Sequence, residues 1–178
     1  MVSMLNVLKN NLEPKEQVMA ASMDDTNPTD SHEQKEINYS DLSRSDVRSL
    51  IFHVLYAMES FNYEDSLEKI VENFNKGFDV NIPLDSQAVT VARACIEQRN
   101  ELDELIKPSL HNWRFDRIGT ITKLILRIAV WELYNTDTPP TVVINEAIEL
   151  AKGFAEQDAY KFINGVLDEQ VKRMAVKK

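Results

Sequence analysis

The polar side chains between residues 142 and 170 are the part of this chain best suited to chemistry. The stretch VVINEAIELAKGFAEQDAYKFINGVLDEQ predicts two helices, separated by a hinge at residues 153–157. Glu146 and Glu149 are three residues apart, so a helix places both carboxylates on one side. A di-iron site would also need a Glu-x-x-His motif on other helices, and the sequence contains none. We therefore expect Glu149 to face solvent rather than a metal.

The histidines and the single cysteine give little support to catalysis. His32, His53 and His111 are far apart in the chain, and none belongs to a metal-binding motif. The sequence also lacks phosphate-binding glycine loops and the GxSxG turn of serine hydrolases. Cys95 is the only cysteine, which excludes an intramolecular disulfide and indicates a buried core thiol in a reducing compartment. We predict a protein that is not an enzyme and has no metal or cofactor.

A short RNA strand offers a better match for the remaining polar residues. Proteins hold single strands with cations on the phosphates and planar side chains under the bases. Arg44 and Arg48 are four residues apart and share one side of an expected helix start. Lys161 and Phe162 begin the last expected helix, next to Asp158 and the free amides of that terminus. These five residues could form a small surface for phosphates and bases.

Charge divides the chain into an acidic tail and a nearly balanced body. Residues 1–43 carry three Lys and eight Asp or Glu, whereas residues 44–178 carry seventeen Lys or Arg and twenty-one Asp or Glu. The formal charge of −9 argues against indiscriminate nucleic-acid binding but leaves room for a small basic patch. Residues 23–36 are polar, acidic and nearly free of large apolar side chains, and residues 1–42 are predicted to be a disordered acidic tail with an amphipathic piece at residues 2–12.

Apolar residues at steps of three and four predict an all-α fold. Only four Gly and six Pro occur, which disfavours a turn-rich β protein, and no strand is expected. No run of eighteen apolar residues occurs, so no membrane span is expected. Six or seven helices are predicted to form two packed three-helix subdomains, at residues 43–108 and 109–174, followed by a basic tail at residues 175–178.

Several local signals refine this prediction. Ser43 or Ser45 is expected to cap the first helix, Asp65 the second, and one long third helix is expected at residues 85–106. Trp113 and Phe115 are expected to anchor the junction between the subdomains. Arg127 lies in a helix that is apolar on nearly all sides. Because an unpaired buried charge is costly, Arg127 either pairs with a carboxylate or contacts a ligand.

Four segments of the folded part resemble the bacterial NusB family of transcription antitermination factors. They are LY at residues 55–56, ILRIAVWEL at 125–133, INEAIELAK at 144–152 and KFINGVLD at 161–168. The resemblance implies two three-helix subdomains packed at a steep angle and a cytoplasmic, non-enzymatic role. It also implies binding to boxA RNA of ribosomal-RNA leaders together with ribosomal protein S10 (NusE), and assembly with the RNA polymerase elongation complex and other Nus factors. Some relatives form a homodimer that hides the RNA surface.

Carried over residue by residue, the resemblance assigns the RNA surface to the first and last helices. In this family an arginine-rich start of the first helix and parts of the last helices form that surface. A tyrosine lies near the S10-binding face, and Tyr56 falls on it here. The residues that fall on RNA-binding positions are Arg44, Arg48, Arg127, Asp158, Lys161, Phe162 and Asn164.

The chain departs from many relatives at the start of the first helix, where only Arg44 and Arg48 remain of a denser arginine cluster. Each lost phosphate contact lowers RNA affinity and releases about one counterion fewer. We therefore expect weak RNA binding by the protein alone and reliance on S10. The alternative is a protein-only helical adaptor that binds S10 with a weakened RNA surface. A ribosomal-RNA cytosine methyltransferase, a class in which a similar helical domain occurs, is disfavoured because the sequence has no glycine-rich cofactor loop.

Overall fold

The computed structural model describes residues 37–78, 80–111 and 113–176, so the predicted disorder of residues 1–36 and the end of the basic tail lie outside it. The described structure begins at Ile37, ahead of residue 43, where the sequence analysis starts the folded part. Seven α-helices account for most of the described chain. They are α2 (Arg44–Ser60), α3 (Leu67–Phe78), α4 (Gln87–Glu97), α5 (Arg99–Ile106), α6 (Thr120–Asn135), α7 (Pro140–Phe154) and α8 (Ala159–Val176).

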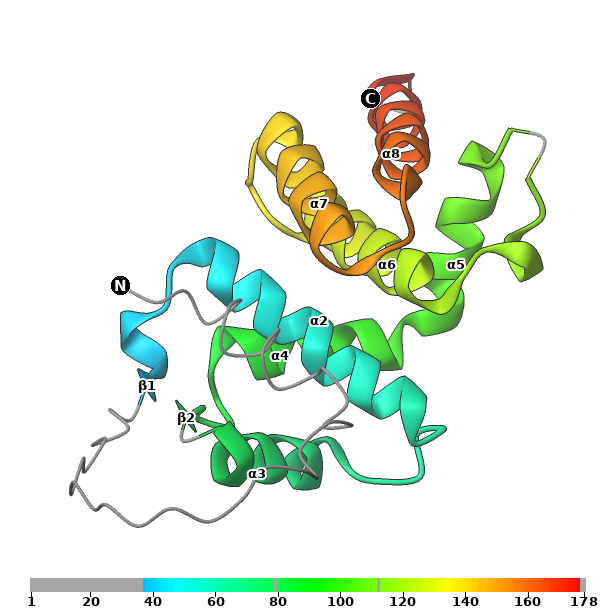
Figure 1. Cartoon of the computed structure of the whole chain (residues 1–178). Coiled ribbons are helices and arrows are strands. Elements are labelled where there is room, and N and C mark those ends of the chain that lie inside the picture. The colour runs from blue at the N-terminus through cyan, green and yellow to red at the C-terminus, as the bar shows by residue number, and fades with distance from the viewer. Residues whose placement is uncertain (1–36, 79, 112, 177–178) are drawn as a thin grey trace, which may run out of the picture.

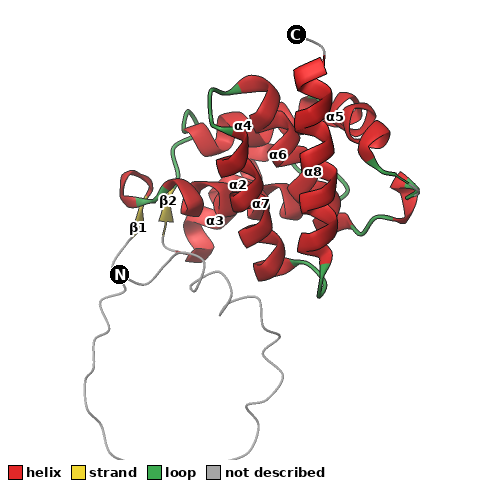
Figure 2. Ribbon diagram, turned by 90° about the horizontal axis from the view of Figure 1, so that it is seen from above, coloured by secondary structure: helices red, strands yellow, loops and turns green. Residues whose placement is uncertain are grey.

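The helices form two packed groups, which confirms the predicted all-α architecture (Figure 1). α2, α3 and α4 pack against one another, and α6, α7 and α8 form the second group. α2 also contacts α6, and α7 lies between α2 and α8 (Figure 2). One cluster of buried apolar side chains runs through both groups. Every residue of α6 from 124 to 130 is buried, as the nearly continuous apolar sequence there predicts.

A short parallel β pair contradicts the prediction that the chain has no strand. β1 (Ile37–Asn38) pairs with β2 (Val80–Asn81), which follows α3. In the next turn, η1 (Tyr39–Asp41), the hydroxyl of Tyr39 accepts a hydrogen bond from the backbone N–H of Ala88 at 3.1 Å. Strands of two residues are too short to show an alternating pattern in the sequence. The pair fixes the point at which the N-terminal tail meets the folded body.

Polar side chains cap the first two helices. Ser43, one of the two predicted candidates, is the N-cap of α2: its Oγ accepts from the N–H of Asp46 at 3.1 Å, and the Asp46 carboxylate accepts from the N–H of Ser43 at 3.2 Å. The prediction that Asp65 caps α3 is wrong. The Oγ of Ser66 accepts from the N–H of Lys69 at 3.2 Å, whereas Asp65 forms an ion pair with the Lys69 ammonium at 2.5 Å.

The predicted long helix at residues 85–106 is two helices in the structure. Gln98 separates α4 from α5 with φ −93° and ψ 15°, and its N–H bonds to the Ala94 carbonyl at 2.9 Å. Apolar residues recur on both sides of this break, so their spacing does not reveal it. α5 packs against α6, and this contact brings Asp103 to Arg127.

His53 is a buried histidine on α2 whose neutral form is favoured. Its ring is edge-on to Phe52 and Phe154, with centroids 5.4 and 4.8 Å away. Its Nδ1 lies 2.6 Å from the carbonyl oxygen of Ser49, which only accepts, so Nδ1 carries the proton. Its Nε2 is buried and has no partner among the described residues. Burial lowers the pKa of His53, and the Ser49 hydrogen bond offsets only part of this effect.

Acidification should therefore destabilise the fold through His53. The unfolded chain binds this proton at a pKa of about 6.5, above that of the folded state, so the free energy of unfolding falls as the pH drops below about 6.5. One proton accounts for at most about 1.4 kcal/mol per pH unit. Urea unfolding of the wild type and of His53→Gln at a series of pH values measures this contribution. The variant should lose less stability on acidification, and an equal loss in both would contradict the assignment.

Candidate nucleic-acid interface

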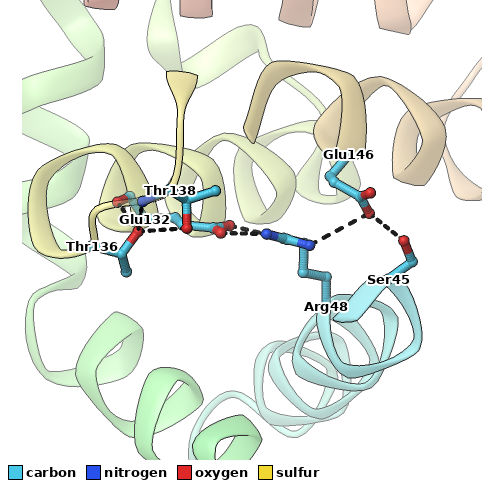
Figure 3. A network of polar contacts seen from close by, with 6 residues as sticks. All are labelled: Ser45, Arg48, Glu132, Thr136, Thr138 and Glu146. Carbon is cyan, nitrogen blue, oxygen red and sulfur yellow. Dashed lines mark hydrogen bonds and ion pairs between the residues drawn. The ribbon is translucent and has the colours of Figure 1, made fainter. Parts of the chain in front are cut away.

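Arg48 links the start of α2 to the second helical group (Figure 3). Its Nε and Nη2 donate to the two carboxylate oxygens of Glu132 on α6, at 3.0 and 2.5 Å. Its Nη1 lies 3.7 Å from a carboxylate oxygen of Glu146 on α7, and the same oxygen accepts from the hydroxyl of Ser45 at 2.7 Å. The hydrogen bond to Glu132 is the main reason that the pKa of Arg48 is raised. Only 11% of the Arg48 side chain is exposed, so this guanidinium is engaged inside the protein.

Two threonines hold the end of α6 beside this network (Figure 3). The hydroxyl of Thr136 donates to the backbone carbonyl of Glu132 at 3.0 Å. The N–H of Thr138 in turn donates to the Thr136 hydroxyl at 3.2 Å. The turn between α6 and α7 is therefore fixed next to the carboxylates that bind Arg48.

Arg44 lies one helical turn before Arg48 and has a different environment. It is exposed and forms no ion pair with any residue that the structure describes. It lines a groove of about 650 Å³ between the start of α2, the start of α4 and the end of α6, which we call the N-terminal groove. Of the two arginines at the start of α2, Arg44 is therefore the one available to an external anion.

Arg127 is paired rather than free, which favours the structural alternative of the two left open by the sequence. Its Nε and Nη2 donate to the carboxylate of Asp103 on α5, at 2.8 and 3.0 Å. Its Nη1 lies 3.5 Å from Glu59 on α2. Only 8% of the side chain is exposed, so Arg127 joins α5 and α2 to α6. Burial lowers the pKa of Arg127, but the hydrogen bonds to Asp103 together with the charges of Asp103, Tyr63 and Glu59 outweigh that effect, so the pKa is raised.

The predicted residues of the last helix lie at the start of α8. Asp158 has φ 70°, a left-handed conformation that Asp tolerates, and it ends the hinge after α7. Its carboxylate lies 2.8 Å from the ammonium of Lys161, whose side chain is 64% exposed. Asn164 donates to the carboxylate of Asp168 at 3.2 Å. The ring of Phe162 packs against Trp113 with centroids 5.2 Å apart.

Trp113 is a candidate contact residue that the sequence analysis assigned to another role. The expected anchor of the subdomain junction is instead 61% exposed. The neighbouring Phe115 ring, which is half-buried, has the ammonium groups of Lys123 and Lys107 above it, at 5.3 and 5.7 Å from its centroid. The sequence signal that could have indicated this surface is an aromatic residue in a polar loop with cations nearby. Only the structure shows that this loop reaches Phe162 on α8.

The structure places the predicted residues in two groups that are joined by α7. The start of α2 meets the middle of α7, where Ser45 binds Glu146. The start of α8 meets the end of α7, where the ammonium of Lys152 lies 5.9 Å from the ring centroid of Tyr160. These two contact points on α7 are about 9 Å apart along the helix axis. α7 therefore connects the elements that carry Arg44 and Lys161.

Tyr56 lies on α2, away from Arg44. Its side chain is 39% exposed, and its ring stacks on Phe52 with centroids 6.2 Å apart. Phe61, just after the end of α2, is 53% exposed. These two aromatic rings give the C-terminal end of α2 an apolar surface, of the kind that is enriched at protein interfaces.

Cys95 and Glu149 have the environments that the sequence predicts. Among the described residues, no group of three or more His, Cys, Asp and Glu side chains could hold a metal ion. Cys95 is buried as predicted, and burial raises the pKa of its thiol to about 12. Glu149 faces solvent as predicted and pairs with Lys152 at 2.7 Å. In the described part of the chain, no helix is long and apolar enough to cross a membrane.

The fold defines an all-α protein of two packed helical groups, on which the exposed Trp113 and Lys161 lie near Phe162. The NusB family profile matches residues 45–172, and the chain belongs to the NusB family. The transcription antitermination protein NusB of Macrococcus caseolyticus is 38% identical over 138 residues, which cover 75% of this chain and 100% of that protein. The NusB of Helicobacter pylori (strain Shi470) is 36% identical over 135 residues, which cover 76% of this chain and 96% of that protein.

Solved structures share the fold. A structure of T. maritima NusB is 30% identical, covers 73% of this chain and 91% of that chain, and has a TM-score of 0.62. A chain in a crystal structure of a plectonemic RNA supercoil is 21% identical, covers 76% of this chain and 98% of that chain, and has a TM-score of 0.65. The matches leave most of the acidic tail outside the family.

Replacing the two arginines of α2 separately should distinguish their roles. Arg48→Met should lower the free energy of unfolding by about 2 kcal/mol, because it leaves Glu132 and Glu146 without their shared cation. Arg44→Met, the matched control, should change it by less than about 0.5 kcal/mol. Urea unfolding of both variants measures the difference. Equal effects would show that the Arg48 ion pairs contribute little to the fold.

Proposed function

We propose that this protein is a transcription antitermination factor that binds boxA RNA of ribosomal-RNA leader transcripts together with ribosomal protein S10 (NusE). In this proposal it joins the elongating RNA polymerase complex with other Nus factors. Its curated relatives are transcription antitermination proteins, which supports the general role. The observation that carries RNA binding is the pair of Trp113 and Phe162 beside the exposed cation Lys161.

The proposed RNA surface combines stacking with a few phosphate contacts. Exposed aromatic rings accept bases of any sequence, at about 1–3 kcal/mol per stacked base. The exposed Trp113 and the half-buried Phe162 packed against it supply the rings, and Lys161 and Arg44 supply cations for phosphates. Arg48 is proposed to act indirectly, because its pairing with Glu132 orients the helix start that presents Arg44. We propose that Tyr56 contacts S10. The protein partner then binds a part of α2 that is separate from Arg44.

A protein-only adaptor remains the second candidate, and one observation favours it. Arg48 and Arg127, two of the three arginines assigned to RNA by the family resemblance, are held in internal ion pairs. A surface with so few available cations binds RNA weakly in the absence of a partner protein. In this second candidate function, the protein binds S10 through the apolar surface at Tyr56 and Phe61 and does not bind RNA.

Variants at the start of α8 should separate the two candidates. Phe162→Leu retains an apolar side chain against Trp113 but removes the ring that stacks, so affinity for boxA RNA should fall about tenfold. Lys161→Ala should weaken binding to a similar or smaller extent. The matched control is Lys76→Ala on α3, because Lys76 is also an exposed lysine paired with an acidic residue, here Glu72 at 2.6 Å. Fluorescence anisotropy with a labelled boxA RNA gives the affinities, and circular dichroism confirms the fold. If all three variants bind as the wild type does, the RNA surface lies elsewhere or is absent.

Salt should have only a mild effect on RNA binding by the protein alone. Two phosphate contacts, from Arg44 and Lys161, correspond to a slope of about −1.4 in log affinity against log salt concentration for a single strand. Adding S10 should raise the affinity and steepen the slope, because S10 adds its own contacts. A titration of boxA binding against potassium chloride, with and without S10, measures both slopes. Tight and steeply salt-dependent binding by the protein alone would contradict this surface.

A further inference from the structure

The N-terminal groove is lined by apolar side chains, which we call its floor, and by polar and charged ones that include the Arg48–Glu132 pair. Its floor comes from four helices and belongs to both helical groups. Arg44 and Asp137 are among its polar lining residues, and Val142, one of the apolar ones, is 41% exposed. A mixed groove of this kind suits an amphipathic helix, whose apolar side meets the floor while its polar side remains in water. The apolar floor residues are Val47, Ile51, Val91, Ile128, Trp131 and Val142.

Trp131 gives the groove an unsatisfied hydrogen-bond donor. Its indole Nε1 is buried and finds no acceptor among the described residues. A buried donor without a partner costs about 1–3 kcal/mol. Trp131 is therefore a groove side chain whose environment a docked segment would change.

The N-terminal tail meets the folded body at the edge of the groove. The β1–β2 pair holds the chain at Ile37–Asn38, and the next two residues, Tyr39 and Ser40, line the groove. A helix over residues 2–12 would be about 16 Å long. A coil as long as residues 13–36 spans about 25–30 Å, so such a helix reaches the groove without strain. A tether of this length also gives residues 2–12 a local concentration at the groove in the millimolar range. At that concentration even a weak interaction is enough to keep the groove occupied.

The sequence of residues 2–12 fits an apolar floor. Met4, Leu5, Leu8 and Leu12 recur at steps of three and four, which places them on one side of a helix. Asn10 lies on the opposite side, together with other polar residues. We propose that residues 2–12 form an amphipathic helix that docks in the N-terminal groove of the same chain.

Docking of residues 2–12 should also weaken RNA binding, and this effect rests on the proposed function. Residues 24–36 carry five Asp or Glu and one Lys, and they precede the groove directly. When residues 2–12 occupy the groove, this acidic stretch is held close to Arg44, which lacks an ion-pair partner in the described structure. Carboxylates there compete with RNA phosphates for the same guanidinium. The docked tail thus competes with RNA for Arg44, and the apparent RNA affinity falls in proportion to the fraction of chains that remain undocked.

The test uses full-length chains and Trp131 as the reporter of the groove. The sequence has two tryptophans, so Trp113→Phe leaves Trp131 as the single fluorophore for this measurement. Leu8→Asp places a charge on the apolar side of the helix and should release it, because an unpaired charge is costly to bury. Asn10→Asp adds the same charge on the polar side and is the matched control. Acrylamide should quench Trp131 more strongly in the Leu8→Asp chain than in the control. A synthetic peptide of residues 1–36 should reverse the change saturably.

RNA affinity adds a second readout, measured in chains that keep Trp113. Docking predicts that Leu8→Asp binds boxA RNA about three- to tenfold more tightly than the wild type, although it carries an extra negative charge. A purely electrostatic effect of the tail predicts weaker binding for Leu8→Asp and Asn10→Asp alike. The two variants therefore separate occlusion from charge repulsion.

Equal quenching of Trp131 in the wild type, Leu8→Asp and Asn10→Asp would overturn the proposal. Protection of Trp131 by boxA RNA or by S10, but not by the tail peptide, would assign the groove to that partner and also overturn it. If no chain binds boxA RNA, the proposed function fails, but Trp131 quenching still decides whether the tail docks.

Discussion

The relative placement of the two helical groups depends on a guanidinium held between two carboxylates. Arg48 on α2 binds Glu132 on α6 and approaches Glu146 on α7, with side chains that are 11%, 14% and 25% exposed. Such charges are stable away from water only while they remain paired, so small shifts of α2 against α6 and α7 are disfavoured. The same geometry leaves Arg44, one turn earlier, at the protein surface. The start of α2 therefore provides both the Arg48 ion pairs, which fix the packing of α2 on α6 and α7, and an exposed cation, Arg44.

Arg127 applies the same constraint at the other end of α2. It joins Asp103 on α5 and Glu59 near the end of α2 to the central helix α6. Arg48 and Arg127 together fix α2 at two places along its length, and neither offers its charge to solvent. The cations left for a ligand are exposed ones such as Arg44 and Lys161. In a chain with a formal charge of −9, the proposed RNA binding is therefore expected to depend on stacking and on a second protein more than on charge.

The sequence predicts the helices well because their apolar stripes and caps are local features. Ser43 and the apolar run of α6 show this, and the family motifs place Phe162 at the right helix start. The break at Gln98 and the β1–β2 pair escape prediction because no periodic pattern marks them. Residue type also cannot show whether an arginine has a partner, since Glu132 lies 84 residues from Arg48. The exposure of Trp113 is likewise set by a loop that packs against a helix distant in sequence.

The two parts of the tail differ in how they respond to salt. Docking of residues 2–12 would bury apolar side chains, and salt does not screen that interaction. The acidic stretch and the RNA backbone both interact with Arg44 through charge, and salt weakens both within a Debye length of about 10 Å at 0.1 M. The acidic stretch is tethered, however, and its local concentration does not change on dilution, whereas that of RNA does. Rising ionic strength therefore favours the docked tail over bound RNA, and a partner that adds its own RNA contacts shifts the balance back.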